Sequence, residues 1–291
     1  MEFPPEPWPV GKADRTEPLV RRVLAANPSA FTFTGTESYI VGTGGEVAVI
    51  DPGPLDDDHV AALLAAVGSA RVTAILCTHT HKDHSPAAAP LAGKTGAPII
   101  GCAPFSLTDD GPRADASFDP TYAPDRVLRD GESVSGPDWT LTAIATPGHT
   151  SNHLCYALEE SGALFTGDHV MGWSTSVVSP PDGDMTAYMA SLQKLIDRDD
   201  RVYYPAHGPE VTKPRQLVRG MIGHRRQREN QILRRIEAGE ARIAEMVPQM
   251  YKGVDRRLWP AAERSVLAHL IDLQRRGRVL RGEDERWAIV G

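Results

Sequence analysis

One short stretch constrains this chain more than any other: Thr78-His79-Thr80-His81-Lys82-Asp83-His84. It places three histidines and an aspartate within six residues, directly after the apolar run Val72–Cys77. Such a run predicts a buried strand, so the four polar side chains stand on the turn where that strand ends. Neutral imidazole and carboxylate are ligands that zinc-like ions favour. The stretch therefore predicts part of a metal site, which needs further ligands from elsewhere in the chain.

Three other segments can supply those ligands. Each places a histidine or an aspartate directly after a short apolar run, and so at the end of a predicted strand. They are Thr146-Pro147-Gly148-His149-Thr150, Phe165-Thr166-Gly167-Asp168-His169 and Pro205-Ala206-His207-Gly208. Loops that leave a rigid scaffold commonly carry the residues of a functional site. We therefore expect these side chains to meet those of the first stretch.

This pattern, HxHxDH followed by a His, an Asp and a His, resembles the metallo-β-lactamase superfamily over residues 30–210. The resemblance implies that Asp51, in Asp51-Pro52-Gly53, orients a ligand histidine; the local sequence alone also allows a simple turn aspartate. His153 and His169 neighbour ligands but are not ligands in this pattern, so we expect them to be structural. The resemblance implies two metal ions, the first held by His79, His81 and His149, the second by Asp83, His84 and His207, with Asp168 bridging them.

The expected fold class is α/β. Helices that flank two packed sheets give an αββα sandwich, which is also the fold that the resemblance implies. We expect an extended arm and a short helix over Leu19–Ala26 near the N-terminus, a strand over Phe31–Thr34, and a second sheet that begins at Val127–Leu128. Residues 103–124 are predicted to form a surface loop. The segment Met171–Asp184 either lines the pocket or is an irregular surface loop.

The C-terminal part shows a different order of elements. Helices are predicted over Pro214–Ala238, Ile243–Tyr251 and Pro260–Arg276, followed by a hairpin of Arg278–Leu280 with Trp287–Val290. Three helices closed by a hairpin resemble a winged helix. We therefore predict a catalytic domain over residues 1–214 and a winged-helix-like domain over residues 215–291. His59, His224 and His269 lie on predicted helices far from the motifs and are not expected to be functional.

Charge and cysteine content bear on partners and compartment. Residues 1–214 carry 14 Lys and Arg against 28 Asp and Glu, a net charge of −14, whereas residues 215–291 carry 17 against 10, a net charge of +7. The basic tail is either a solvated helical surface or an anion-binding one. No apolar stretch approaches the ~20 residues that span a bilayer, and the acidic, proline-rich start is unlike a signal peptide. With three widely spaced cysteines (Cys77, Cys102 and Cys155), we expect reduced thiols, a cytoplasmic protein and no membrane partner.

The ligand set defines the chemistry to expect. A two-metal centre lowers the pKa of a shared water, so we expect a metal-bridging hydroxide to hydrolyse an acyl or phosphoryl bond. Asp83 would orient that water or accept its proton. The ligands suit two zinc ions and also admit iron or manganese.

The substrate is left open between classes. One resemblance is to the β-lactamase-like endoribonucleases, which cleave single-stranded RNA; it rests on the winged-helix-like tail and on the segments 167–172 and 179–184. The basic tail could attract RNA, but the acidic catalytic part would repel it. The segment 146–150 also occurs in the glyoxalase II branch, so hydrolysis of a small acyl thioester or lactone is the alternative. A β-lactamase fits less well, because the chain has Asp168 and no signal peptide. A non-catalytic nucleic-acid-binding protein would be favoured by the loss of a ligand, and none is lost.

Overall fold

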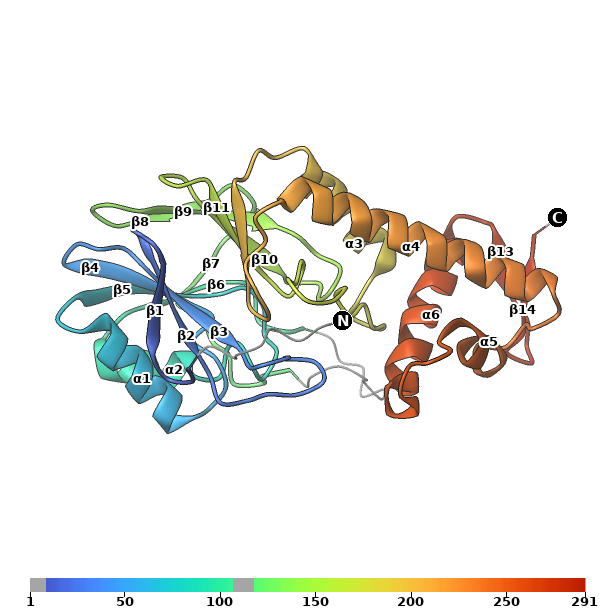
Figure 1. Ribbon diagram of the computed structural model, residues 1–291, viewed down its shortest axis with the longest axis horizontal. Coiled ribbons are helices and arrows are strands. Elements are labelled where there is room, and N and C mark those ends of the chain that lie inside the picture. Colours follow the sequence, from blue (N-terminus) through green and yellow to red (C-terminus); the bar gives the residue numbers. More distant parts are fainter. Residues whose placement is uncertain (1–8, 107–117, 291) are drawn as a thin grey trace.

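The computed structural model describes residues 9–106 and 118–290, and its larger part is two sheets packed face to face with helices outside both (Figure 1). The first sheet has seven strands and the second has five. In order across the sheet, the first comprises β1 (Ala13–Glu17), β2 (Val20–Leu24), β3 (Glu37–Val41), β4 (Glu46–Ile50), β5 (Arg71–Cys77), β6 (Ile99–Gly101) and β7 (Arg126–Val127). The second comprises β12 (Val202–Pro205), β11 (Ala163–Gly167), β10 (Leu154–Leu158), β9 (Thr140–Ala145) and β8 (Ser133–Ser135). The predicted αββα layering is confirmed.

Helices cover the outer face of each sheet. α1 (Asp57–Val67) and α2 (Ala88–Thr95) share a core with the first sheet, whereas α3 (Met185–Ile196) and the start of α4 (Pro214–Glu237) pack on the second. α1 begins where the Asp56 carboxylate accepts hydrogen bonds from the N–H groups of Asp58 and His59, a standard N-cap. It ends at Gly68, whose φ of +67° suits glycine.

Strand direction brings several loops to one edge. β4, β5 and β6 are parallel neighbours in the first sheet, and β11 and β12 are parallel in the second. The carboxyl ends of parallel strands lie at the same edge of a sheet, so the loops that follow them are neighbours. These loops carry Asp51 after β4, residues 78–84 after β5, Asp168 after β11 and His207 after β12. The order and direction of the strands therefore place these predicted site residues at one edge of the two sheets.

The remaining elements form a smaller unit at the other end of the molecule (Figure 1). It comprises α5 (Ile243–Met250), a 3-10 turn at Arg256–Leu258, α6 (Trp259–Arg275) and the hairpin β13 (Val279–Arg281) with β14 (Trp287–Ile289). Its own apolar core includes Ile232 and Ile236 from the second half of α4. Because the first half of α4 belongs to the core of the second sheet, this helix is common to both units. The division at residues 214 and 215 stays a prediction.

Three predicted elements were wrong. Leu19–Ala26 contains the strand β2 instead of a helix, because it pairs with β1 on one side and β3 on the other and buries Val20 and Val23. The segment Phe31–Thr34 is a turn, in which Phe33 has a φ of +58°. The strand predicted at Val127–Leu128 is β7, which pairs with β6 and so extends the first sheet instead of beginning the second. Of the predicted loop over residues 103–124, residues 107–117 lie outside the described part.

Two further expectations concern the cysteines and the membrane. Cys77, Cys102 and Cys155 are free and buried. Across residues 9–106 and 118–290, none of the helices has the length and apolar character needed to cross a bilayer.

Candidate metal centre

All seven predicted ligand residues converge at the common edge of the two sheets. They form two groups, and within each group one potential ligand atom per residue lies within 4.8 Å of the others. Six of the seven side chains are buried, and Asp83 is partly exposed. The first group is His79, His81, His149 and Asp168; the second is Asp83, His84 and His207.

Asp168 lies between the groups. Its Oδ2 is 3.5 Å from His149 Nε2 and 4.0 Å from His79 Nε2. Its Oδ1 is 3.5 Å from His84 Nε2 and 3.3 Å from His207 Nε2. Each carboxylate oxygen therefore faces a different set of histidines, which is the geometry that a bridging ligand requires.

The spacing of the donor atoms fits a metal ion in each group. His81 Nδ1 lies 2.8 Å from His79 Nε2 and 3.1 Å from His149 Nε2. Asp83 Oδ2 lies 3.2 Å from His207 Nε2 and 3.4 Å from His84 Nε2. Donors around a tetrahedral zinc with bonds of about 2.1 Å are about 3.4 Å apart, so these groups are close to the required size.

Several of these atoms lack other partners. Asp83 Oδ1, His84 Nε2 and Asp168 Oδ1 are buried and form no hydrogen bond with any residue that the structure describes. Buried polar atoms are rarely left without a partner, and a bound cation would supply one for each of these atoms. The donor set and its unpaired atoms therefore fit a pair of divalent cations.

Backbone carbonyls fix the orientation of two histidine rings. His149 Nδ1 lies 2.6 Å from the carbonyl oxygen of Val177, and His207 Nδ1 lies 3.1 Å from that of Gly35. A carbonyl only accepts, so each Nδ1 carries the proton. The Nε2 lone pair of each ring is then directed toward Asp168 and is available to a metal ion.

Asp51 connects to one histidine in each group. Its Oδ2 accepts hydrogen bonds from His84 Nδ1 (3.0 Å) and from Thr78 Oγ1 (2.7 Å), while its Oδ1 accepts from the Thr78 backbone N–H (2.7 Å). The same Thr78 Oγ1 lies 3.0 Å from His79 Nδ1 and can accept a hydrogen bond from it. Thr78, which the sequence did not single out, thus extends the reach of Asp51 from His84 to His79.

The two histidines that were expected to be structural lie behind the site. His153 Nε2 accepts a hydrogen bond from the Asp168 backbone N–H (3.2 Å), and its Nδ1 lies 2.9 Å from Thr146 Oγ1. His153 therefore supports Asp168 from behind and belongs to neither ligand group. The ring of His169 is fully buried against Tyr188, at a centroid distance of 4.8 Å.

The electrostatics of the site favour positive charge at its centre. Burial lowers the pKa of His79 well below its usual value, and the neighbouring His84 and His81 lower it further. His79 is therefore a neutral imidazole, the form that binds a metal ion. Burial acts in the same direction on His84, but the carboxylates of Asp83 and Asp168 outweigh it and raise the pKa of His84 well above its usual value. The carboxylates therefore favour a protonated His84. Bound cations would balance the same negative charge.

A cavity of about 30 Å³ lies over the two groups. Besides ligand residues it is lined by Phe31, Met171 and Val177, so part of the segment predicted to line the pocket does so. Of the histidines expected to lie far from the motifs, His224 lines a second cavity that adjoins this one through Met171. His224 is therefore nearer to the site than its position in the sequence indicated, while its expected lack of function stays a prediction.

Family models match two parts of the chain. The Metallo-beta-lactamase superfamily model matches residues 31–207, and the Beta-lactamase associated winged helix domain model matches residues 243–287. The first match covers the strands from β3 to β12 and all seven side chains of the centre. The second covers the smaller unit from α5 to the first residue of β14.

Individual proteins are similar over most of the chain. The Beta-lactamase-like protein 2 homolog of Drosophila melanogaster is 32% identical over 282 residues, 93% of each chain. The Atrochrysone carboxyl ACP thioesterase of Aspergillus fumigatus is 34% identical over 227 residues, 76% of this chain and 66% of that protein. The crystal structure of a metallo-beta-lactamase family protein from Thermus thermophilus shares the fold with a TM-score of 0.76 at 22% identity, covering 95% of this chain and 100% of that one. With the centre described above, these matches show that the chain belongs to the metallo-beta-lactamase superfamily and is a metal-dependent hydrolase with a C-terminal winged helix domain.

Proposed function

We propose that the protein is a two-metal hydrolase of carboxylic thioesters, with His79, His81 and His149 on one ion, Asp83, His84 and His207 on the other, and Asp168 bridging. The observation that carries the two-metal assignment is the position of Asp168, whose two oxygens face separate histidine groups. Zinc suits these ligands, and iron or manganese would also fit them. When bound, such a pair of cations supplies an activated water at neutral pH and polarises the carbonyl of the substrate.

Asp83 is the proposed proton acceptor. Its Oδ2 lies among the histidines of the second group, while its Oδ1 is buried and makes no hydrogen bond among the described residues. Burial alone would raise the pKa of Asp83, but His84 and His207 outweigh that effect and hold the pKa well below its usual value. Asp83 is therefore an ionised carboxylate, and its role as orienting group and proton acceptor is supported by the free Oδ1 rather than by its pKa.

The thioester class is supported by the relatives. The similarity to the Aspergillus fumigatus acyl carrier protein thioesterase extends over 76% of the chain, well beyond the ligand motif alone. Thioesters and carboxylic esters need the same steps, namely attack on a carbonyl carbon and departure of a thiolate or alkoxide.

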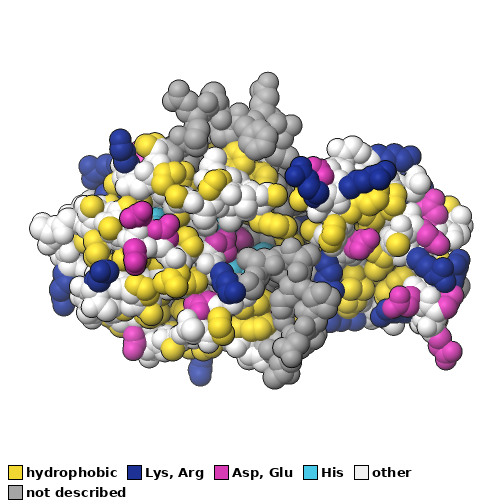
Figure 2. All heavy atoms as spheres, turned by 90° about the horizontal axis from the view of Figure 1, so that it is seen from below, with side chains coloured by type: hydrophobic (Ala, Val, Ile, Leu, Met, Phe, Trp, Pro, Cys, Tyr) yellow, Lys and Arg dark blue, Asp and Glu magenta, His cyan; other side chains and the backbone are white. Residues whose placement is uncertain are grey.

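Single-stranded RNA is the second candidate, favoured by the net charge of +7 in residues 215–291. The basic side chains are interspersed with acidic ones, however, and eight arginines of this part pair with carboxylates: Arg215, Arg235, Arg242, Arg257, Arg275, Arg276, Arg281 and Arg286. Six of these pairs use carboxylates that the net charge of +7 already includes, so only the pairs of Arg215 with Asp199 and of Arg275 with Asp184 offset part of the excess. Figure 2 shows acidic and basic side chains interspersed over this end of the molecule on the face in view. A surface of mixed sign is less suited to a polyanion than a continuous basic one.

The test compares both substrates with one protein. Zinc-loaded protein should release thiol from an acyl-coenzyme A thioester, and Asp83→Asn should reduce kcat by at least about a hundredfold. Asp56→Asn is the matched control, since Asp56 caps α1 away from the centre and asparagine caps equally well. Cleavage of a labelled single-stranded RNA that depends on Asp83, without thioester turnover, would instead establish the nuclease.

A further inference from the structure

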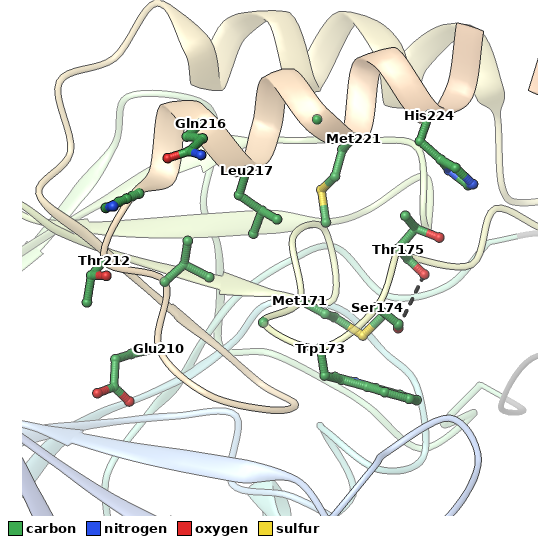
Figure 3. A pocket seen from close by; sticks show the side chains of 14 residues that line it. Met171, Trp173, Ser174, Thr175, Glu210, Thr212, Gln216, Leu217, Met221 and His224 are labelled. Carbon is green, nitrogen blue, oxygen red and sulfur yellow. Dashed lines mark hydrogen bonds between the residues drawn. The ribbon is translucent and has the colours of Figure 1, made fainter. Parts of the chain in front are cut away.

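A cavity of about 640 Å³ lies beside the metal centre (Figure 3). Its walls are the segment Met171–Thr175, the segment Glu210–Lys213 and one face of α4. The first wall begins three residues after Asp168 and the second begins three residues after His207. Two sides of this cavity are therefore direct continuations of the loops that present proposed metal ligands.

Met171 separates this cavity from the centre. Its side chain lines both the 640 Å³ cavity and the small cavity over the ligand groups. Methionine is unbranched and flexible at every side-chain bond, so it can yield to a bound chain at little cost. The two cavities thus share one adaptable side chain, whose movement would connect them.

The lining is apolar within and polar at the rim. Met171, Val211 and Met221 are each less than a tenth exposed, and Figure 3 shows Leu217 and Met221 of α4 directed toward Met171 and Trp173. Exposed polar residues such as Lys213 and Gln216 lie at the α4 N-terminal end. Two buried polar atoms of the lining, Trp173 Nε1 and His224 Nδ1, form no hydrogen bond with the described residues. The cavity therefore offers apolar contact area together with a few unused polar atoms.

We infer that this cavity binds the acyl chain of the substrate, an inference that rests on the proposed thioesterase function. The volume falls within the ~300–1,000 Å³ that is usual for small-molecule sites, which are mostly apolar with a few polar groups. The chain lies between α4 and the segment Met171–Thr175, and the thioester carbonyl reaches the ligand groups past Met171. The substrate class is thus a thioester of a medium-length, apolar acyl group, in preference to an acetyl or other short group.

Gly220 gives a way to fill the cavity without disturbing its walls. It lines the cavity from α4, and a Cβ added there meets no atom within 4 Å. Gly223 lies on the same helix, is also exposed and has the same free space, but it is not part of the lining. Leucine at either position gains the same helix propensity, whereas only Gly220→Leu places a side chain in the cavity.

The experiment measures chain-length dependence in these two variants. With zinc-loaded wild-type protein, kcat/KM should rise roughly fourfold for each added methylene between butyryl- and decanoyl-coenzyme A, since each methylene is buried. Gly220→Leu should lose at least about tenfold on the decanoyl substrate and little on the acetyl one, while Gly223→Leu should match wild type throughout. Calorimetric titration with decanoate should show the same loss of affinity in Gly220→Leu only.

The outcomes separate the two proposals. Decanoate binding that Gly220→Leu weakens, in a protein that hydrolyses no thioester, would support the cavity and refute the thioesterase. Thioester hydrolysis with no dependence on chain length, unchanged in Gly220→Leu, would overturn the assignment of the cavity and leave the thioesterase standing. Equal losses in Gly220→Leu and Gly223→Leu would also overturn it, because the effect would then come from the helix.

Discussion

Replacing Asp51 by asparagine should weaken both metal sites at once. The Asp51 carboxylate accepts three hydrogen bonds, two from Thr78 and one from His84 Nδ1. Asparagine has the same shape but only one oxygen, so its NH₂ group must replace one of the two accepting oxygens. In either orientation at least one buried donor then faces another donor.

The size of the effect follows from these contacts. One buried donor left without an acceptor costs about 1–3 kcal/mol, which should appear as a loss of unfolding free energy. Loss of an outer partner of a ligand histidine typically lowers metal affinity about 10- to 100-fold. Because Asp51 supports His84 directly and His79 through Thr78, we expect the affinity of both ions to fall.

The assay is competition of each variant with a chromophoric chelator for zinc, together with urea unfolding of the metal-free proteins. Asp56→Asn, at the cap of α1, is the control and should behave as wild type in both measurements. If Asp51→Asn folds and binds two equivalents of zinc with wild-type affinity, the proposed support of the centre by Asp51 is refuted.

Four further outcomes are expected. Burial lowers the pKa of His59 to about 4, so the folded state resists protonation of this ring. About 3 kcal/mol of stability should therefore be lost as pH falls from 6.5 through 4. In urea titrations, the unfolding free energy of His59→Gln should depend less on pH over this range. Burial raises the pKa of Glu37 to about 8, so the folded state favours the neutral acid. Stability should therefore fall by about 5 kcal/mol as pH rises from 4.5 through 8. The unfolding free energy of Glu37→Gln relative to wild type should be greater at pH 9 than at pH 5. A Cβ at Gly172 would lie 1.9 Å from the Pro209 carbonyl oxygen, so Gly172→Ala should lower the free energy of unfolding by about 1–3 kcal/mol. In Gly93→Ala the added Cβ meets no atom within 4 Å, so thermal unfolding should show a small gain in stability. Removal of the metals by a chelator should lower the unfolding temperature and readdition should restore it; free metal at a thousand times its Kd contributes about 4 kcal/mol, and an unchanged melting curve would contradict a metal centre in the folded chain.

The convergence of the ligand residues was predictable because each follows an apolar strand directly. Short runs such as Val72–Cys77 are recognisable, and parallel pairing places their ends together without further information. The same local signals could not identify Thr78 or His153, whose roles depend on distant partners in three dimensions. What these seven residues bind stays a prediction from the resemblance and the geometry.

Other parts of the fold were hidden from the sequence for physical reasons. The segment Leu19–Ala26 lacks helix-breaking residues, and only pairing on both edges makes part of it a strand. Arg225 lies in the basic run 224–228, which suggests a solvated face, yet its side chain is buried. It donates to the Ser176 carbonyl and lies over the Tyr188 ring at 5.0 Å. The partners that bury Arg225 are distant in the sequence, so no local pattern predicts its burial.

The double membership of α4 makes the winged helix domain a structural support of the hydrolase. Arg225 of this helix donates to the Ser176 carbonyl, and the Ser176 hydroxyl donates to the Asp168 carbonyl, so two hydrogen bonds connect the helix to the proposed bridging ligand. A truncation after residue 214 would remove the part of the second sheet's cover that α4 supplies, together with a wall of the proposed acyl cavity and any nucleic-acid-binding surface. Loss of activity in such a fragment would therefore be uninformative about RNA. A cut after the end of α4 would also disturb the hydrolase, because α6 contributes Ala268 to the same core and its Asp272 accepts a hydrogen bond from Thr186 of α3. Any change that tilts α4 from the C-terminal end would therefore shift the Asp168 loop and, with it, the proposed metal centre.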